Sequence, residues 1–361
     1  MRYLTAGESH GPQLTAIIEG IPSGLALTAT MINVDLRRRQ NVDGRGGRMK
    51  IEQDEVQIVS GVRHGITLGS PITLVIPNKD FKNNQELMSV ERVDGYEIPT
   101  KTVPRAGHAD LSGAMKYNHK DLQNVLERAS ARETAIRVAI GGVCKQILSQ
   151  LNVEIVSEVT QIGTVTSENG KVTEEMKQAI DQAKAAGDSL GGKVKITATE
   201  LPIGLGSYVH YDRKLDAKLA HDVMSIQLVK GAKFGENQTF LGRATHDQIA
   251  YDKDQGFHRL TNHSGGIEGG MTTGMPMVIH VEVKPIPTLY KPIDSVDLLT
   301  KEVQPSLVER SDTCGVPAVA VILESVVATT LTQEILNQFT SDTMEQLKGQ
   351  VTRYRKDTHA F

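Results

Sequence analysis

Two short segments of the chain resemble each other, and each stands before a valine-rich helical pattern. Residues 127–130 (ERAS) line up with residues 309–312 (ERSD), 182 positions later. If the match is real, the chain consists of two related halves, which is the strongest limit that this sequence sets on its fold. A chance match is the alternative, because only four residues are compared.

The remaining hydrophobic patterns predict mixed strands and helices. Leucine, isoleucine and valine at three- and four-residue spacing predict the longest helix over residues 121–151, and Gly141 and Gly142 inside it are best explained by close packing against another helix. The order of elements favours a layered α+β domain over a regular βαβ alternation. Further helices are predicted over residues 173–187 and 213–228 and from Pro317 onward; strands are predicted over residues 13–22, 55–60, 71–77, 153–166, 192–203 and 275–285.

Composition limits the class of protein. The chain of 361 residues has no Pro/Ser-rich linker or low-complexity block, so we expect one continuous domain over residues 1–361. No apolar run of signal-peptide or membrane-span length stands out, and Cys144 and Cys314 are too few for a disulfide framework or a metal site. These features predict a cytoplasmic protein without a metal, and a pI near 6.4 predicts no general affinity for nucleic acid.

One stretch, residues 35–52, is locally basic. It holds six Lys and Arg against three acids, and its three glycines let the backbone turn back on itself. Guanidinium groups bind phosphates and carboxylates through two parallel hydrogen bonds, so Arg39, Arg45 and Arg48 are candidates for an anion site. A solvated basic loop or a nucleic-acid patch remains the alternative.

Two histidines lie beside glycines in stretches that could carry chemistry. His108 lies in PRAGHAD, residues 104–110, and His10 lies in GESHG, residues 7–11. Imidazole is the side chain best suited to proton transfer near neutral pH, although a loop histidine is more often an ordinary surface residue. We do not interpret GESHG as a nucleophile elbow, because His10 follows the serine and the next apolar run predicts a strand, so a serine hydrolase of that type is rejected.

Three further stretches suggest anion or cofactor contacts. Arg128 and Arg132 lie four residues apart, so a helix would place them on one face, where both could bind the same anion. Ion pairs with Glu127 and Glu133 are the alternative. The glycine-rich residues 263–276 form neither a P-loop nor a Rossmann fingerprint, but such loops can expose NH groups to phosphate or to a flat heterocycle. In ERSDTCGVPAV, residues 309–319, the aspartate is either a helix cap or a base.

Taken together and in this order, these motifs resemble the chorismate synthase family nearly from end to end. The matching segments are GESHGP (7–12), RRRQNVDGRGGRMKIE (37–52), PRAGHAD (104–110), RASARETAIRVAIGG (128–142), NHSGGIEGGMTTG (262–274) and ERSDTCGVPAVA (309–320). The resemblance implies a carbon–oxygen lyase that converts 5-enolpyruvylshikimate 3-phosphate to chorismate by anti 1,4-elimination of phosphate, the last common step of the shikimate pathway. It also implies reduced FMN without net redox change, a three-layer β-α-β sandwich with an internal pseudo-two-fold repeat, and a homotetramer.

The resemblance further implies residue roles. His10 would be the acid for the leaving phosphate, His108 would stay protonated beside the flavin, and Asp312 would relay a proton. Arg48, Arg105 and Arg132 would bind substrate, whereas Arg39 and Arg45 match positions associated with NADPH or substrate. The positions that match FMN contacts are Arg128, Ala129, Ser130, Gln227, Leu228, Gly269, Lys284, Pro285, Ile286, Pro287, Thr288 and Arg310.

The sequence departs from the family pattern at two places. Gln227 and Leu228 stand where Asn-Ala is usual, and Ala106 replaces a common proline near His108. A flavin oxidoreductase that uses NADPH is the rival enzyme hypothesis. An RNA-binding protein is the rival of another class, although aromatic residues are only 4% of the chain and stacking platforms are therefore scarce. Whether NADPH reduces the flavin here, or a separate flavin reductase does, is left open by the residues.

Overall fold

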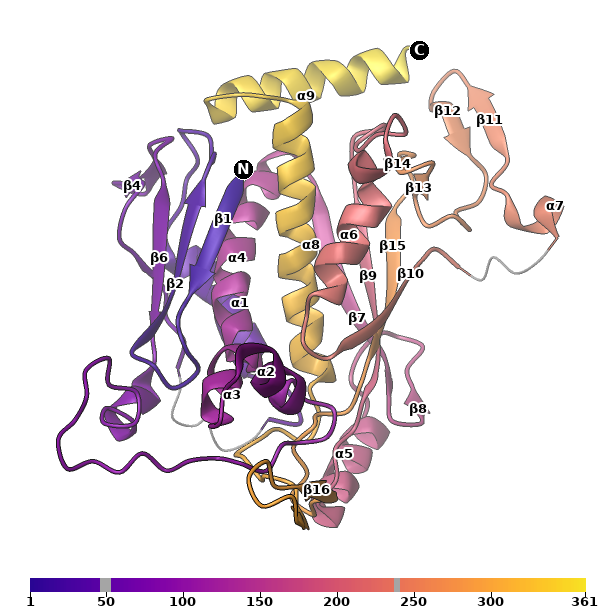
Figure 1. Ribbon diagram of the computed structural model, residues 1–361. Helices are drawn as coiled ribbons and strands as arrows, with labels where there is room; N and C mark the ends of the chain where they lie inside the picture. Colours follow the sequence, from indigo (N-terminus) through magenta and orange to yellow (C-terminus); the bar gives the residue numbers. More distant parts are fainter. Residues whose placement is uncertain (46–52, 237–240) are drawn as a thin grey trace.

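A layer of helices lies between two antiparallel sheets in the computed structural model, which describes residues 1–45, 53–236 and 241–361 (Figure 1). The first sheet has the order β1-β2-β6-β3 and the second the order β10-β15-β9-β7-β8. The strands are β1 (Arg2–Ala6), β2 (Gln13–Glu19), β3 (Gln57–Ile58), β6 (Ile72–Pro77), β7 (Glu154–Ile162), β8 (Val165–Thr166), β9 (Gly192–Thr199), β10 (Val229–Phe234) and β15 (Met277–Val283). The central helices are α1 (Ala29–Gln40), α4 (Thr134–Gln150), α6 (Leu215–Met224) and α8 (Val316–Gln338).

The two halves repeat the same order of elements. Apart from short connecting elements, the first half runs β1, β2, α1, β3, β6, α4, and the second runs β7, β9, α6, β10, β15, α8. Equivalent strands also hold equivalent places, since β1-β2-β6-β3 corresponds to β7-β9-β15-β10. The matching residues 127–130 and 309–312 precede the equivalent helices α4 and α8. The predicted β-α-β sandwich with an internal repeat is therefore confirmed.

Strand alternation directs one face of each sheet toward the helices. In β2, Leu14, Ala16 and Ile18 are buried while Ile17 between them is half exposed. In the second sheet, alternate residues of β15 from Met277 onward are buried in the same way. One continuous hydrophobic core joins both sheets and the helix layer.

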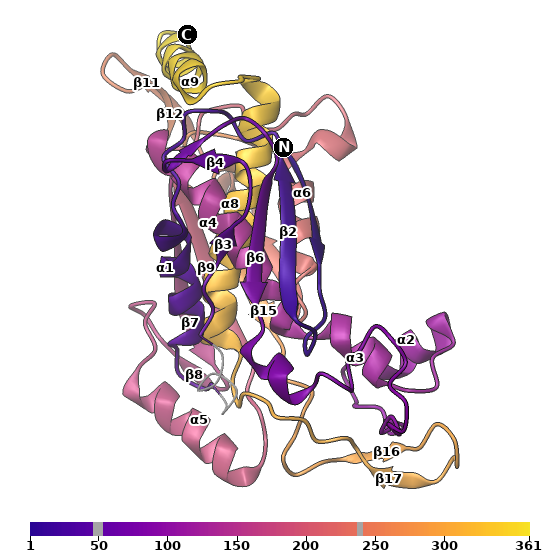
Figure 2. The same ribbon diagram turned by 90° about the vertical axis from the view of Figure 1, so that its left-hand side faces the viewer.

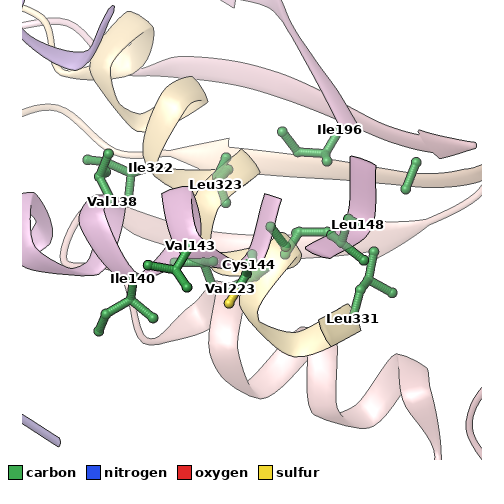
Figure 3. Close-up of a cluster of buried hydrophobic side chains, with 14 of the residues drawn as sticks. Val138, Ile140, Val143, Cys144, Leu148, Ile196, Val223, Ile322, Leu323 and Leu331 are labelled. Atoms are coloured by element: carbon green, nitrogen blue, oxygen red, sulfur yellow. The ribbon is translucent and has the colours of Figure 1, made fainter. Parts of the chain in front are cut away.

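Helices α4 and α8 touch at a glycine, as the sequence predicts. A Cβ atom at Gly141 would lie 2.3 Å from the Cβ of Ser325 in α8, and one at Gly142 would lie 3.1 Å from Ile32 in α1. Figure 3 shows the apolar cluster around this contact, to which α4 gives Val143 and Cys144 and α8 gives Leu323. The two halves of the repeat thus meet through the backbones of their equivalent helices.

The prediction of one continuous helix over residues 121–151 is wrong. It is divided into α3 (Gln123–Ala129), a 3₁₀ turn (Ala131–Glu133) and α4, because Ser130 is extended, with φ −62° and ψ 139°. The Ser130 hydroxyl accepts a hydrogen bond from the Arg132 N–H at 3.2 Å, which caps the new turn. At 23 residues α8, not α4 with 17, is the longest helix within the described ranges.

Other predictions need smaller corrections. Residues 153–166 form a hairpin, β7 and β8, instead of one strand. The basic stretch begins on a helix, since residues 35–40 are the end of α1. By length and composition α8 could span a membrane, contrary to the expectation that no run approaches that length, but almost all of it is buried within the protein.

The connecting elements gather at the two ends of the sandwich. Both termini and α9 lie toward one end, and α2, α3, α5 and the β16–β17 hairpin lie toward the other (Figures 1 and 2). Their bounds are η2 (Lys79–Asn83), α2 (Asp110–Tyr117), α5 (Glu174–Ala186), α7 (Gly242–Thr245), α9 (Met344–His359), β4 (Val62–Arg63), β5 (Ile66–Thr67), β11 (Ile249–Asp252), β12 (Gly256–Arg259), β13 (Ile267–Glu268), β14 (Met271–Thr272), β16 (Asp294–Val296) and β17 (Val303–Pro305).

Candidate active site

A cavity of about 690 Å³ opens where α4 and α8 begin. Thr134 in the first turn of α4 and Ala318 and Val319 in the first turns of α8 line it, together with segments from both halves. The first N–H groups of a helix have no partner within the helix and carry partial positive charge, so two helix N-termini at one cavity favour anions there.

Most of the predicted site residues line this cavity, although they come from segments far apart in the sequence. Arg48 lies outside the described residues. Of the predicted residues within the described ranges, Arg128, Gly269 and Pro285 are not part of the lining. Those that line it are His10, Arg39, Arg45, Arg105, His108, Ala129, Ser130, Arg132, Gln227, Leu228, Lys284, Ile286, Pro287, Thr288, Arg310 and Asp312.

The three exceptions have clear locations. The exposed Arg128 donates hydrogen bonds to the Gly7 carbonyl and to the Thr5 hydroxyl, the latter at 2.7 Å. Gly269 lies in the β13–β14 turn, toward the α9 end of the molecule and away from the cavity (Figure 1). Pro285 lines a second, smaller cavity of about 470 Å³.

His10 is held by a buried carboxylate. Glu127 Oε1 lies 2.8 Å from His10 Nδ1, and Glu127 Oε2 accepts a hydrogen bond from the His10 backbone N–H at 2.8 Å. Burial alone would raise the pKa of Glu127, but its hydrogen bonds with His10 and the charge of that imidazole hold the pKa below its usual range. Glu127 is therefore ionised at neutral pH beside the His10 ring.

His108 has a similar partner. Its Nδ1 lies 2.6 Å from Asp110 Oδ1, and Arg105 donates from Nε to Asp110 Oδ2 at 2.8 Å. Asp110 is completely buried, which would raise its pKa, but the hydrogen bonds from His108 and Arg105 hold the pKa well below the usual range. The carbonyl of Gly107, a residue with φ +76°, accepts a hydrogen bond from Lys284.

Arginines form one wall of the cavity. Arg39 is only 4% exposed, and it donates from Nη2 to the Thr134 hydroxyl at 3.0 Å. Its Nε and Nη1 have no hydrogen-bond partner among the described residues, although Nη1 lies 3.6 Å from Asp54. Burial, followed by the charge of nearby Arg45, lowers the pKa of Arg39 to about 9. Burying Arg39 with two hydrogen-bond donors unsatisfied is unfavourable, and an anion bound at this wall would accept those hydrogen bonds and balance the positive charge.

One predicted arrangement is corrected here, and one alternative is excluded. Arg132 and Arg128 do not share a helix face, because the break at Ser130 turns Arg132 inward, where it donates to Asp54 at 2.7 and 2.9 Å and to Asn78. Asp312 is not the helix cap of α8, since Gly315 holds that position. Asp312 accepts instead from Arg45 Nη1 at 2.6 Å.

Another part of the cavity wall is apolar and comes from the second half. Leu228, Ile286 and Pro287 line it with the first turns of α8, and a Cβ atom at Gly315 would lie only 2.5 Å from Leu228 Cδ1. Gln227 donates to Glu133 at 3.1 Å, while its buried Oε1 has no partner among the described residues. Such a wall suits the face of a flat ring system, with one amide oxygen left to accept a hydrogen bond.

The chain is similar to known proteins over its full length. A family model described as chorismate synthase matches residues 1–336. The chain belongs to the chorismate synthase family. It is 53% identical to chorismate synthase 1 of Bacillus anthracis and 51% identical to the chorismate synthase of Geobacillus thermodenitrificans (strain NG80-2), with all of both chains covered in each case. A solved crystal structure of a chorismate synthase has a TM-score of 0.80 and 37% identity, and the alignment covers 100% of this chain and 98% of that one.

The sequence patterns missed several partners at this cavity. The sequence pattern predicts Glu127 only as an ion-pair partner of arginine, and it does not indicate Asp54. Lys101 and Glu309 pair with each other and line the same cavity. The only sequence signal for Glu127 was its place in the repeated ERAS segment. No group of three or more His, Cys, Asp and Glu side chains in the described ranges could hold a metal ion.

Proposed function

We propose that this protein converts 5-enolpyruvylshikimate 3-phosphate to chorismate by anti 1,4-elimination of phosphate, with reduced FMN and no net redox change. The observation that carries the proposal is the buried Arg39, whose Nε and Nη1 have no hydrogen-bond partner among the described residues, on the cationic wall of a large cavity. The substrate has two carboxylates and a phosphate, so it would satisfy such a wall. The family match supports the same reaction.

The residues present fit a flavin mononucleotide. The apolar wall of Leu228, Ile286 and Pro287 would contact a flat ring system. Gln227 Oε1, which has no partner among the described residues, would accept a hydrogen bond from the edge of that ring system. Burial, together with the charge of Lys230, lowers the pKa of Lys284, and an anionic phosphate beside Lys284 would offset that effect. Bound reduced flavin would supply transient electron density to the substrate and recover it within the same turnover.

The protein's own residues would then do three things. Arg39, Arg45 and the other cavity arginines would neutralise the phosphate as its negative charge grows, which lowers the barrier to its departure. His10 would give a proton to the leaving phosphate. His108, fixed by Asp110, would hold a proton toward the cavity, and the Asp312 carboxylate, fixed by Arg45, would pass a proton on.

Further properties belong to the same proposal. We propose a single domain over residues 1–361, because one hydrophobic core joins both halves. A cytoplasmic location is supported by Cys144 and Cys314, both buried and unpaired. The homotetramer, and NADPH or a separate flavin reductase as the source of electrons, stay predictions from the family resemblance.

The decisive experiment is anaerobic incubation of the purified protein with dithionite-reduced FMN and 5-enolpyruvylshikimate 3-phosphate. The proposal predicts one chorismate and one phosphate for each substrate consumed, with the flavin still reduced at the end. Stoichiometric flavin oxidation would favour the oxidoreductase alternative, and an unchanged substrate would refute the proposed reaction. Adding NADPH and oxidised FMN to the isolated protein, and following NADPH absorbance, separates intrinsic flavin reduction from dependence on another enzyme.

A further inference from the structure

Glu127 is joined to His10 by two hydrogen bonds, whereas a simple ion pair needs only one contact between the charged groups. Its two carboxylate oxygens accept from two different donors of the same residue, the backbone N–H of His10 and the ring Nδ1, each at 2.8 Å. Next to them, the backbone N–H of Ser9 donates to the Glu127 carbonyl at 2.9 Å. Residues 9 and 10 are thus attached at three points to α3, and Gln123 also donates to the same carboxylate.

We propose that Glu127 is a positioning residue that fixes the His10 ring through Nδ1 and keeps a proton on that nitrogen, so that Nε2 is the nitrogen presented to the reaction. The inference rests on the proposed function for the role of His10 as an acid. An ionised carboxylate can only accept hydrogen bonds, so the proton between Glu127 Oε1 and Nδ1 belongs to the ring. Since Nδ1 is occupied, a second proton on the ring can reside only on Nε2.

Burial makes this pair effective. The Glu127 side chain is 6% exposed and the His10 side chain 15%, so little water competes with their hydrogen bond. A buried carboxylate needs hydrogen-bond donors, and the backbone N–H and ring Nδ1–H of His10, together with Gln123, supply them. Arg128, the neighbouring cation on α3, does not replace these donors, because its guanidinium donates to a carbonyl and a hydroxyl elsewhere.

The two donors of His10 make glutamine an informative substitute. A carboxamide has nearly the shape of the carboxylate but only one oxygen, so it cannot accept from both the His10 N–H and Nδ1–H. In Glu127→Gln the amide NH₂ would face Nδ1, which must then lose its proton and accept. The ring would be neutral with its one proton on Nε2, and a neutral imidazole is a far weaker acid than an imidazolium.

The test combines kinetics with NMR of protein labelled with ¹⁵N in histidine, and the His10 signals are assigned by their loss in His10→Gln. In the wild type at neutral pH we expect Nδ1 of His10 to carry a proton. In Glu127→Gln we expect the Nδ1 signal to move to the unprotonated range, with kcat reduced about 100-fold and KM nearly unchanged. Glu127→Asp, which keeps both oxygens on a shorter side chain, should retain the proton and recover part of kcat.

Glu334→Gln is the matched control. Glu334 is also a buried glutamate, paired with Lys218 at 2.7 Å and with Asn337, but it lies in α8 outside the lining of the cavity. Its substitution should leave kcat and the His10 signals unchanged.

Each outcome decides one question. A kcat of Glu127→Gln within about twofold of the wild type, or an unchanged Nδ1 signal in that variant, would overturn the inference. If Glu127→Gln does not fold, an unprotonated Nδ1 in the wild type alone would overturn it. A wild type that makes no chorismate would instead refute the proposed function, while the NMR signals would still report on the pair.

Discussion

The two halves of the repeat build the same sandwich but give the cavity unlike walls. The first half supplies both histidines and most of the cations, and the second supplies most of the apolar surface. The repeated backbone places two equivalent helix N-termini at one site. The side chains of the two halves differ there, so one half would bind anionic groups and the other would contact a ring. The wall residues of the first half include His10, Arg39, Arg45, Arg105, His108 and Arg132; those of the second include Leu228, Ile286, Pro287, Ala318, Val319 and Ile322.

The matching segments before α4 and α8 show the same divergence. Glu127 and Glu309 stand at equivalent positions, yet the first binds His10 and the second binds Lys101. The arginines that follow them, Arg128 and Arg310, are both exposed, whereas Arg132 is buried. Pattern similarity therefore predicted equivalent places in the fold but not equivalent partners.

The largest expected effect concerns the histidine-bearing wall. His10→Ala and His108→Ala should each lower kcat by about 10²- to 10⁴-fold, because each removes a proton-handling group, with a much smaller change in KM. Steady-state chorismate formation with reduced FMN measures both constants. His221→Ala is the control, since His221 is largely exposed on α6 and is outside the lining of the cavity. Wild-type kinetics in either cavity variant would remove that histidine from the proposed chemistry.

The second prediction compares an arginine from each half by urea unfolding. Arg132→Ala leaves the buried Asp54 without its main partner and should lower the free energy of unfolding by about 3–5 kcal/mol. Arg310→Ala removes an ion pair with the buried Asp80 at 2.7 Å, but the Arg310 side chain is 57% exposed and Asp80 also accepts from Asn83 at 2.9 Å, so the loss should be smaller, about 1–2 kcal/mol. Equal losses of unfolding free energy in the two variants would contradict the contrast between the buried Arg132 and the exposed Arg310.

The third prediction tests the charged contact that joins the halves. Glu324 of α8 accepts from Arg38 of α1 at 2.7 and 2.9 Å and from Lys145 of α4 at 2.8 Å. Burial would raise the pKa of Glu324, but the hydrogen bond from Arg38 and the charge of Lys145 lower it from 4.5 to about 2. A carboxyl whose pKa is lower in the folded state stabilises the fold above pH 4.5, and this contribution is lost as the pH falls toward 2.

Urea unfolding at two pH values measures this contribution. Between pH 7 and pH 3 the wild type should lose about 2 kcal/mol through Glu324, and Glu324→Gln should lack that part of the decrease. Glu174→Gln on α5 is a control, because its ion pair with Lys177 is exposed. An identical pH dependence in the wild type and Glu324→Gln would contradict the assignment.

Local patterns predicted much of this fold, and non-local contacts explain what they missed. Alternation located the strands, and the close approach of helices was predicted from Gly141. The break at Ser130 could not be predicted, because helical spacing continues on both sides and the inward turn depends on Asp54 and Asn78. The position of Gly269 outside the cavity likewise follows from sheet topology, which a motif does not contain.

The last prediction tests the helix contact between the halves. Gly141→Ala would place a Cβ atom 2.3 Å from the Cβ of Ser325, so α4 and α8 must move apart, and the free energy of unfolding should fall by about 1–3 kcal/mol. Gly349→Ala is the matched control, since Gly349 lies in α9 with nothing within 4 Å of an added Cβ. There alanine should stabilise by about 0.5–1 kcal/mol, because it favours a helix more than glycine does. Opposite signs in urea unfolding are therefore expected. A stabilising Gly141→Ala would mean that the two halves are not held together by direct contact of these helix backbones.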